Sequence, residues 1–130
     1  MAKTGSEAKV GERLQLGRWG ESRAVHHLES LGCQVVALNW RCAAGEADIV
    51  ALDGDCLVLV EVRTRRGQVY GTPEESITPR KLARMAAVAE TCVYEENWCG
   101  DWRIDVVTII ARGRGCAAIE WYKDVSARPA

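Results

Sequence analysis

The sequence contains no phenylalanine and only two histidines, and none of its apolar runs approaches the roughly 20 residues that span a bilayer. The lack of a long apolar run argues against a transmembrane helix. The first stretch, residues 1–13, is polar and charged and lacks the apolar centre of a secretory signal peptide. We therefore expect a cytoplasmic protein with no membrane association.

The sequence also lacks an excess of charge of either sign. It has 17 lysines and arginines against 18 aspartates and glutamates, a net charge of −1, so the overall charge predicts no attraction to nucleic acid. The six cysteines include no Cys-x-x-Cys pair, the spacing typical of zinc ligands. Because disulfide frameworks belong to secreted chains, we expect the thiols to be reduced, scattered and mostly buried.

A chain of 130 residues is long enough for one domain. Residues 1–15 show no apolar periodicity, and we expect a flexible leader before a single domain over residues 16–125. The patterning predicts, in order, a helix over 18–31, strands over 33–38, 47–52 and 56–63, a helix from Thr78, and strands over 103–111 and 117–122. The segments 39–45 and 67–77 are expected as connections. The order α-β-β-β-α-β-β predicts an α/β fold, a mixed central sheet flanked by helices.

Particular residues support two of these helix boundaries. Gly32 is placed to end the first helix in a left-handed conformation. Thr78 followed by Pro79 is a typical helix start, because threonine caps the first turn and proline suits its first position.

Acidic residues interrupt the two apolar strands expected over 47–52 and 56–63. If Asp53-Gly54 forms a two-residue hairpin turn, Glu46, Asp48, Glu61 and Arg63 emerge on one face, with Asp48 diagonal to Glu61. Their Cβ atoms would then lie about 7–8 Å apart, which suits one hard cation held between two carboxylates. The alternative is that Glu61 forms an ion pair with a neighbouring arginine at a wet strand end.

Glu21 extends this acidic group. Its spacing from Ala24, Val25 and Leu28 places it on the buried face of the first helix. It therefore either contributes to an acidic site or offsets the dipole of the helix from its first turn.

Basic residues gather at the start of the second helix. Arg80, Lys81 and Arg84 occupy its first two turns, where positive charge opposes the helix dipole. This placement favours an anion-binding surface, and the alternative is a solvated basic face.

Five stretches of the sequence resemble the YraN family of small bacterial proteins. They are, in the order of the family, GRWGESRAVHHLESLG, NWRCAAGEADIVA, LVLVEVRTR, YGTPEESITPRKLARM and RIDVVTI. They span residues 17 to about 110, most of the chain. The family in turn resembles the restriction-endonuclease-like, or PD-(D/E)xK, superfamily, which includes the archaeal Holliday-junction resolvases.

The resemblance implies an α-β-β-β-α-β core and a set of site residues. Asp48 corresponds to the aspartate of the superfamily motif, Glu61 to its glutamate and Glu21 to the glutamate of the first helix. Arg63 stands where the motif has lysine. Arginine keeps the charge and binds phosphate oxygens in a bidentate manner, but it does not give up its proton.

Three functions are consistent with these residues. The first is a DNA endonuclease that uses Mg²⁺ or Mn²⁺, with Asp48, Glu61 and Glu21 as metal ligands and Arg63 at the scissile phosphate. In this hypothesis other basic residues hold flanking phosphates: Arg41, Arg65, Arg66, Arg80, Lys81 and Arg84. The second is a catalytically weak or inactive nuclease fold that binds nucleic acid, with tryptophans such as Trp19 as stacking surfaces. The third is an adaptor for a protein partner. The likeness to resolvases also allows a homodimer, because a junction has twofold symmetry.

Overall fold

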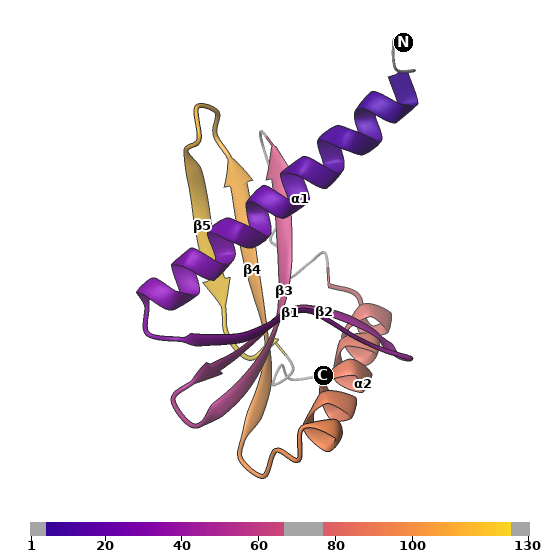
Figure 1. The fold of residues 1–130 in the computed structure, drawn as a ribbon, viewed down its shortest axis with the longest axis vertical. Coiled ribbons are helices and arrows are strands. Elements are labelled where there is room, and N and C mark those ends of the chain that lie inside the picture. The colour runs from indigo at the N-terminus through magenta and orange to yellow at the C-terminus, as the bar shows by residue number, and fades with distance from the viewer. Residues whose placement is uncertain (1–4, 67–76, 126–130) are drawn as a thin grey trace.

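The computed structural model describes residues 5–66 and 77–125, and for residues 5–14 it describes only the backbone. Two helices and five strands follow one another in the expected order (Figure 1). They are α1 Gly5–Ser30, β1 Gln34–Cys42, β2 Gly45–Asp53, β3 Cys56–Arg66, α2 Pro79–Glu95, β4 Trp102–Ala111 and β5 Ala117–Tyr122. The predicted α/β fold, a mixed sheet flanked by helices, is confirmed.

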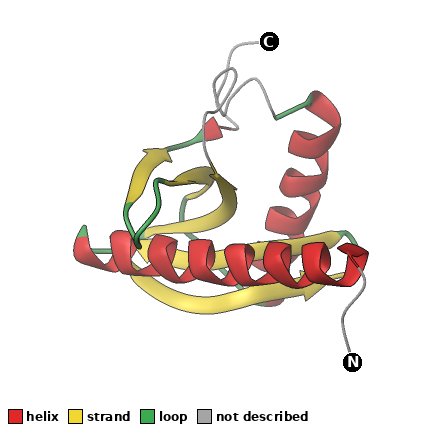
Figure 2. Cartoon of the chain, turned by 90° about the horizontal axis from the view of Figure 1, so that it is seen from above, coloured by secondary structure: helices red, strands yellow, loops and turns green. Residues whose placement is uncertain are grey.

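The sheet has the strand order β1-β2-β3-β4-β5. Neighbouring strands are antiparallel except β3 and β4, which are parallel and are joined through α2. The helices run in different directions (Figure 2) and cover opposite faces of the sheet. Ala24 and Leu28 of α1 pack on one face, and Val88 and Cys92 of α2 pack on the other. Residues of β3 alternate between the two cores, as expected for a central strand buried on both faces.

Helix α1 begins earlier than its apolar pattern predicts. It starts at Gly5 instead of residue 18, so most of the segment expected as a flexible leader is helical. The segment is rich in Glu, Lys, Arg, Leu and Gln, which favour helix without requiring a buried face. At its other end α1 stops as predicted: Gly32 has φ +97°, and the amide of Cys33 donates to the carbonyl of Leu28 at 3.0 Å.

Strand β1 is longer than expected and is irregular. The connection expected over 39–45 is mostly strand, since β1 continues to Cys42 and β2 begins at Gly45. The pairing of β1 with β2 shifts between Val35 and Ala37, and Asn39 has φ +51°. These irregularities hid the strand, because they break the alternation from which strands are recognised.

The β2–β3 hairpin has a different register from the one expected. Asp53 pairs with Cys56 and Ile49 with Val60, so the two turn residues are Gly54 and Asp55 and not Asp53 and Gly54. Gly54, with φ +59°, takes the first position of the turn. In this register the last paired residues, Ile49 and Val60, are the immediate chain neighbours of Asp48 and Glu61.

Helix α2 begins as the sequence predicts. The side chain of Thr78 accepts a hydrogen bond from the amide of Lys81 at 3.1 Å, and Pro79 is the first helical residue. The preceding loop, expected over 67–77, lies outside the described residues except for Ile77. In the described part of the chain no helix is both long enough and apolar enough to cross a membrane.

All six cysteines are free, as expected. They are less buried than expected. Cys33 and Cys92 are buried, Cys42 and Cys56 are partly buried, and the other two are exposed: Cys99 and Cys116.

Candidate functional site

Strands β2 and β3 separate at the predicted acidic residues. Their backbone pairing ends at Ile49 and Val60. One residue further, a carboxylate oxygen of Asp48 accepts a hydrogen bond from the backbone amide of Val62 at 2.7 Å. This bond to a side chain takes the place of the next backbone hydrogen bond between β2 and β3. It holds the carboxylate of Asp48 at the point where the two strands separate, which we call the fork.

The acidic side chains line two hollows on either side of this fork, not one face as expected. Glu21 and Asp48 line a hollow beside α1, together with Val62 and Thr64. Three of the predicted residues line a second hollow beside α2: Glu46, Glu61 and Arg63. The expectation of a single face is therefore wrong for Asp48.

The reason is a break in the alternation of β2. Ala47 packs in the core beside α2, whereas Ile49, two residues later, packs in the core beside α1. In a regular strand these two residues would share a face. The break at Asp48 turns its side chain toward α1.

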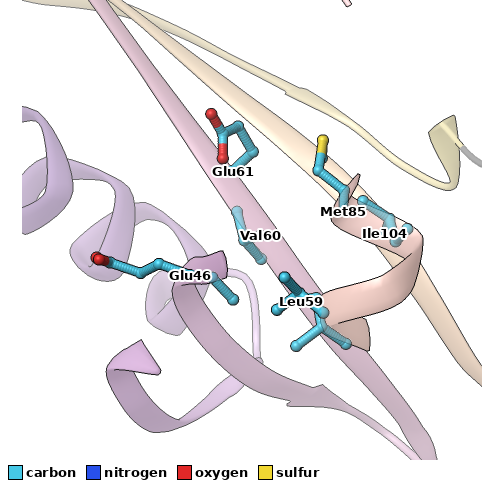
Figure 3. Close-up of a pocket in the computed structure, with 8 residues that line it drawn as sticks. Glu46, Leu59, Val60, Glu61, Met85 and Ile104 are labelled. Atoms are coloured by element: carbon cyan, nitrogen blue, oxygen red, sulfur yellow. The ribbon is translucent and has the colours of Figure 1, made fainter. Parts of the chain in front are cut away.

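Figure 3 shows the α2 side of the fork. Glu46 and Glu61 border a narrow pocket whose other walls are apolar, with Leu59 and Val60 from β3 and Met85 from α2. The Glu46 side chain points away from Met85. Glu61 thus borders an apolar pocket, and burial disfavours the charged form of its carboxylate.

The position of Glu21 depends on a close approach of α1 to β3. A Cβ added at Gly20 would lie 1.9 Å from Oγ1 of Thr64, so only glycine allows the observed spacing. Glu21 is the next residue, and it reaches the hollow of Asp48 because the helix lies this close.

Asn39 is a site residue that the sequence analysis missed. With its amide nitrogen turned toward the acidic residues, it donates to Oε1 of Glu21 at 3.2 Å and to Oε1 of Glu46 at 2.8 Å. Its left-handed backbone is one that asparagine tolerates better than most residues. An asparagine just before a tryptophan is the only signal in the sequence, and it falls in the segment expected as a connection.

The carboxylates at the fork raise one another's pKa. Burial raises the pKa of Asp48 most, and Glu46 adds to the shift, while the hydrogen bond from Val62 and the charge of Arg63 oppose it. Burial and the charge of Asp48 raise the pKa of Glu61, against Arg63 and Lys81. Burial, Asp48 and Glu46 raise the pKa of Glu21, and the hydrogen bond from Asn39 lowers it. The positive charges of Arg63 and Lys81 therefore do not fully offset the effects of burial and of carboxylate repulsion on these pKa values.

Arg63 faces Glu61 without binding it tightly. Its Nε lies 3.5 Å from Oε1 of Glu61, and this buried nitrogen has no hydrogen-bond partner among the described residues. A buried donor without a partner is rare. The Nε of Arg63 is therefore a hydrogen-bond donor that the described side chains leave unsatisfied.

The other basic residues divide into two groups. Lys81 and Arg84 line the hollow of Glu61 and Arg63, so the start of α2 supplies positive charge to the site as expected. The remainder do not line it. The side chain of Arg41 is exposed and forms an ion pair with Glu46 at 3.0 Å. Three other arginines are exposed and lie outside this hollow: Arg65, Arg66 and Arg80.

Hard cations such as Mg²⁺ and Mn²⁺ prefer carboxylate ligands of the kind found at the fork. Asp48, Glu61 and Glu21 would hold such an ion, and the raised pKa values indicate that a cation would relieve their repulsion. In the part of the chain that the structure describes, no three acidic, histidine or cysteine residues are already arranged as metal ligands. The residue types fit the ion, and their side chains would have to move toward it.

Comparisons with known proteins place most of the chain in one family. Residues 20–109 match the model of "Uncharacterised protein family UPF0102". A UPF0102 protein of Pseudarthrobacter chlorophenolicus is 44% identical over 118 residues, covering 85% of this chain and 85% of the relative. One from Roseiflexus castenholzii is 52% identical over 103 residues, covering 77% and 82%. One from Streptomyces coelicolor is 38% identical over 125 residues, covering 94% and 96%. The chain belongs to the UPF0102 family, that of the YraN-like proteins.

Proposed function

We propose that this protein is a metal-dependent DNA endonuclease of the restriction-endonuclease-like class. The observation that carries the proposal is the fork between β2 and β3, where carboxylates with raised pKa values lie beside the unpaired donor of Arg63. The α-β-β-β-α-β order around this fork is the arrangement that the resemblance to that superfamily implies. Sites of this composition bind a cation and a phosphate together.

In this proposal each residue of the fork has its own role. Asp48 and Glu61 hold Mg²⁺ or Mn²⁺, and Glu21 completes the ligand set from α1. The ion, when bound, activates water and neutralises charge that develops on the phosphate. Arg63 contacts the scissile phosphate through its guanidinium, which is geometrically suited to bidentate binding of phosphate oxygens. Lys81 and Arg84 hold neighbouring phosphates from the side of α2.

Arg63 also supports a second candidate function. The superfamily motif implies lysine at this position, and arginine does not release a proton near neutral pH. With arginine in place, the fold would bind nucleic acid at the fork and cleave it slowly or not at all. This second function retains the contacts to phosphate that the nuclease would make, but without its catalytic turnover.

A cleavage assay separates the two candidates. Linear, nicked, single-stranded and four-way-junction DNA are incubated with the full chain in Mg²⁺, in Mn²⁺ or in EDTA. We expect cleavage in the presence of metal, and loss of that cleavage in the Asp48→Asn and Glu61→Gln variants. Asp55→Asn, on the exposed hairpin turn at the far end of β2, is the matched control and should cleave as the wild type does.

Two results would count against the nuclease. Cleavage that persists in Asp48→Asn would remove the fork from the reaction. Junction binding without products, by every form and in every metal, would favour the binding module instead.

A further inference from the structure

A further hollow lies next to the fork, and none of the residue roles given under the proposed function uses it. It lies between α1, the ends of β3 and β4, and the turn that joins β4 to β5. We call it the Trp19 hollow. Its main lining residues are Leu16, Trp19, Arg66, Ala111, Arg114 and Cys116.

The Trp19 hollow continues from the acidic site. Leu16 of α1 lines both this hollow and the one that contains Glu21 and Asp48. Because β3 and β4 are parallel, their ends lie together, and Arg66 pairs with Ala111 there. Figure 1 shows the β4–β5 turn at this same end of the sheet. A strand of nucleic acid that leaves the fork along α1 would therefore enter the hollow.

The charges of the hollow are of one sign. Arg66 and Arg114 line it, and no acidic residue of the described chain does. Both side chains are exposed, and within the described residues neither forms an ion pair or hydrogen bond. In contrast, Arg41 and Arg103 are paired with carboxylates. The arginines of the hollow are therefore available to an anion from solution.

The turn fixes one of these arginines. The amide of Arg112 donates to the carbonyl of Cys116 at 2.9 Å, and the amide of Cys116 donates to the carbonyl of Gly113 at 3.0 Å. Arg114 lies at the tip of this short turn, with φ +52°. Its Cα is thereby held at the rim of the hollow while its side chain extends from it.

Trp19 is the aromatic side chain that lines the hollow among the described residues. Trp19 is half-buried, packs against the core beside α1, and carries the guanidinium of Arg23 at 5.8 Å from its ring centre. An indole held in this way is a rigid surface for stacking. An aromatic wall with two free arginines has the chemistry that recognises an unpaired base and its phosphate. In a duplex the base would already be stacked on its neighbours.

We propose that the Trp19 hollow binds an unpaired nucleotide of the strand that enters the acidic site, with the base on Trp19 and the phosphate at Arg66 and Arg114. The inference rests on the proposed function, because it names the form of nucleic acid that this site takes. It selects substrates with a single-stranded segment over continuous duplex.

The test is a binding measurement without metal. The anisotropy of a labelled oligothymidylate of about 12 nucleotides, of the matching RNA, and of a blunt DNA duplex is titrated with the full chain in EDTA. Arg66→Ala and Arg114→Ala should each weaken binding of the single strand and each reduce the slope of log affinity against log salt by about 0.7. Trp19→Leu should weaken it at least about fivefold, and Trp19→Phe, which keeps a ring, should weaken it less. The DNA and RNA arms identify which sugar the hollow accepts.

Lys123→Ala is the control, since it removes an exposed positive charge beside Trp121, outside the hollow. The proposal is overturned if the Arg66, Arg114 and Trp19 variants bind the single strand as Lys123→Ala does, or if they lose duplex binding equally. If Trp19→Leu does not fold, the arginine variants and Trp19→Phe still decide the question. Because the assay contains no metal, weakened binding in these variants supports the hollow even if the wild type never cleaves. Cleavage that the hollow variants leave unchanged supports the nuclease alone.

Discussion

The carboxylate of Asp48 accepts a hydrogen bond from the backbone amide of Val62, at 2.7 Å, where the pairing of β2 with β3 ends. One oxygen of Asp48 therefore has a structural role at the fork. Its other oxygen makes no hydrogen bond to the described residues. The stability of the fork and the proposed metal binding thus depend on the same side chain. Different substitutions of Asp48 distinguish the two roles.

Asp48→Asn and Asp48→Ala should differ in stability and agree in activity. The asparagine can still accept the bond from Val62 and removes a repelling charge, so its free energy of unfolding should equal or exceed that of the wild type. The alanine leaves the amide of Val62 unsatisfied and should lose about 1–3 kcal/mol. Denaturant unfolding measures both, and cleavage should be absent from both. Equal stability of the two variants would show that the bond contributes nothing.

The carboxylates of the fork should make the protein less stable as pH rises. The pKa values of Glu21, Asp48 and Glu61 are raised in the folded state, so folding takes up protons. The free energy of unfolding should fall as pH increases above the ordinary values of 3.8 for aspartate and 4.5 for glutamate. Glu61→Gln should reduce this fall. Glu29→Gln, on the exposed side of α1, is the control and should leave it unchanged.

The pKa of Asp53 shifts in the opposite direction, so its effect on the pH dependence of stability can be distinguished from that of the fork carboxylates. Its hydrogen bond with Arg103 lowers its pKa, so its contribution to stability is lost only as pH falls below 3.8. A stability that rises with pH above 4.5 and is insensitive to Glu61→Gln would contradict the argument from repulsion at the fork.

A divalent ion that binds the fork should raise the melting temperature. An ion at 100 times its dissociation constant adds about 2.7 kcal/mol if it binds only the folded state. We expect a shift with Mn²⁺ and with Mg²⁺ that EDTA reverses, measured by thermal unfolding. Asp48→Asn should abolish the shift. An equal shift in that variant would place the ion elsewhere.

Gly20→Ala should loosen the attachment of α1. The added Cβ would lie 1.9 Å from Oγ1 of Thr64, and crowding of this kind destabilises by about 1–3 kcal/mol. Gly17→Ala is the matched control on the same helix. Its Cβ would meet nothing within 4 Å, so it should stabilise by up to about 1 kcal/mol through helix propensity.

A double-variant cycle tests the cause of this loss. Thr64→Ala removes the nearest atom and should recover part of the stability of Gly20→Ala. Because Glu21 is a proposed metal ligand next to Gly20, displacement of α1 should move it away from the ion. The Gly20→Ala variant should therefore also cleave more slowly than the Gly17→Ala variant. Full activity with a displaced helix would remove Glu21 from the ligand set.

Asp105→Asn should strongly destabilise the fold without touching the fork. Asp105 is fully buried on β4 and accepts hydrogen bonds from Nε of Arg103 at 3.0 Å, from Nε1 of Trp121 at 2.8 Å and from the amide of Asp124 at 2.8 Å. Loss of one partner from a buried ion pair costs about 3–5 kcal/mol. Denaturant unfolding measures the loss, and Asp55→Asn, on an exposed turn, is the control. A loss under about 1 kcal/mol would mean that the neutral amide oxygen of the asparagine satisfies these donors nearly as well as the carboxylate does.

Local features of the sequence determined the order of elements and several of their ends. Thr78 and Pro79 fix the start of α2, and Gly32 fixes the end of α1, because each acts on backbone groups within one turn of itself. Asp48 and Glu61 could be named because acidic residues next to buried strands are unusual, and Glu21 from its spacing on the buried face of the first helix. The motif resemblance pointed to the same residues.

Tertiary structure decided how these residues meet. The register depends on which two residues form the hairpin turn, and with Gly54 and Asp55 in the turn the pairing ends at Ile49 and Val60, next to Asp48 and Glu61. The approach of α1 at Gly20, the bridge from Asn39 and the burial of Asp105 each join segments distant in the chain. Such contacts depend on three-dimensional packing, which the periodicity and composition of the sequence do not reveal. The sequence by itself therefore singled out the candidate carboxylates and Arg63, and the packing of α1 and β1 against the fork brought Asn39 to them and decided which hollow each of them lines.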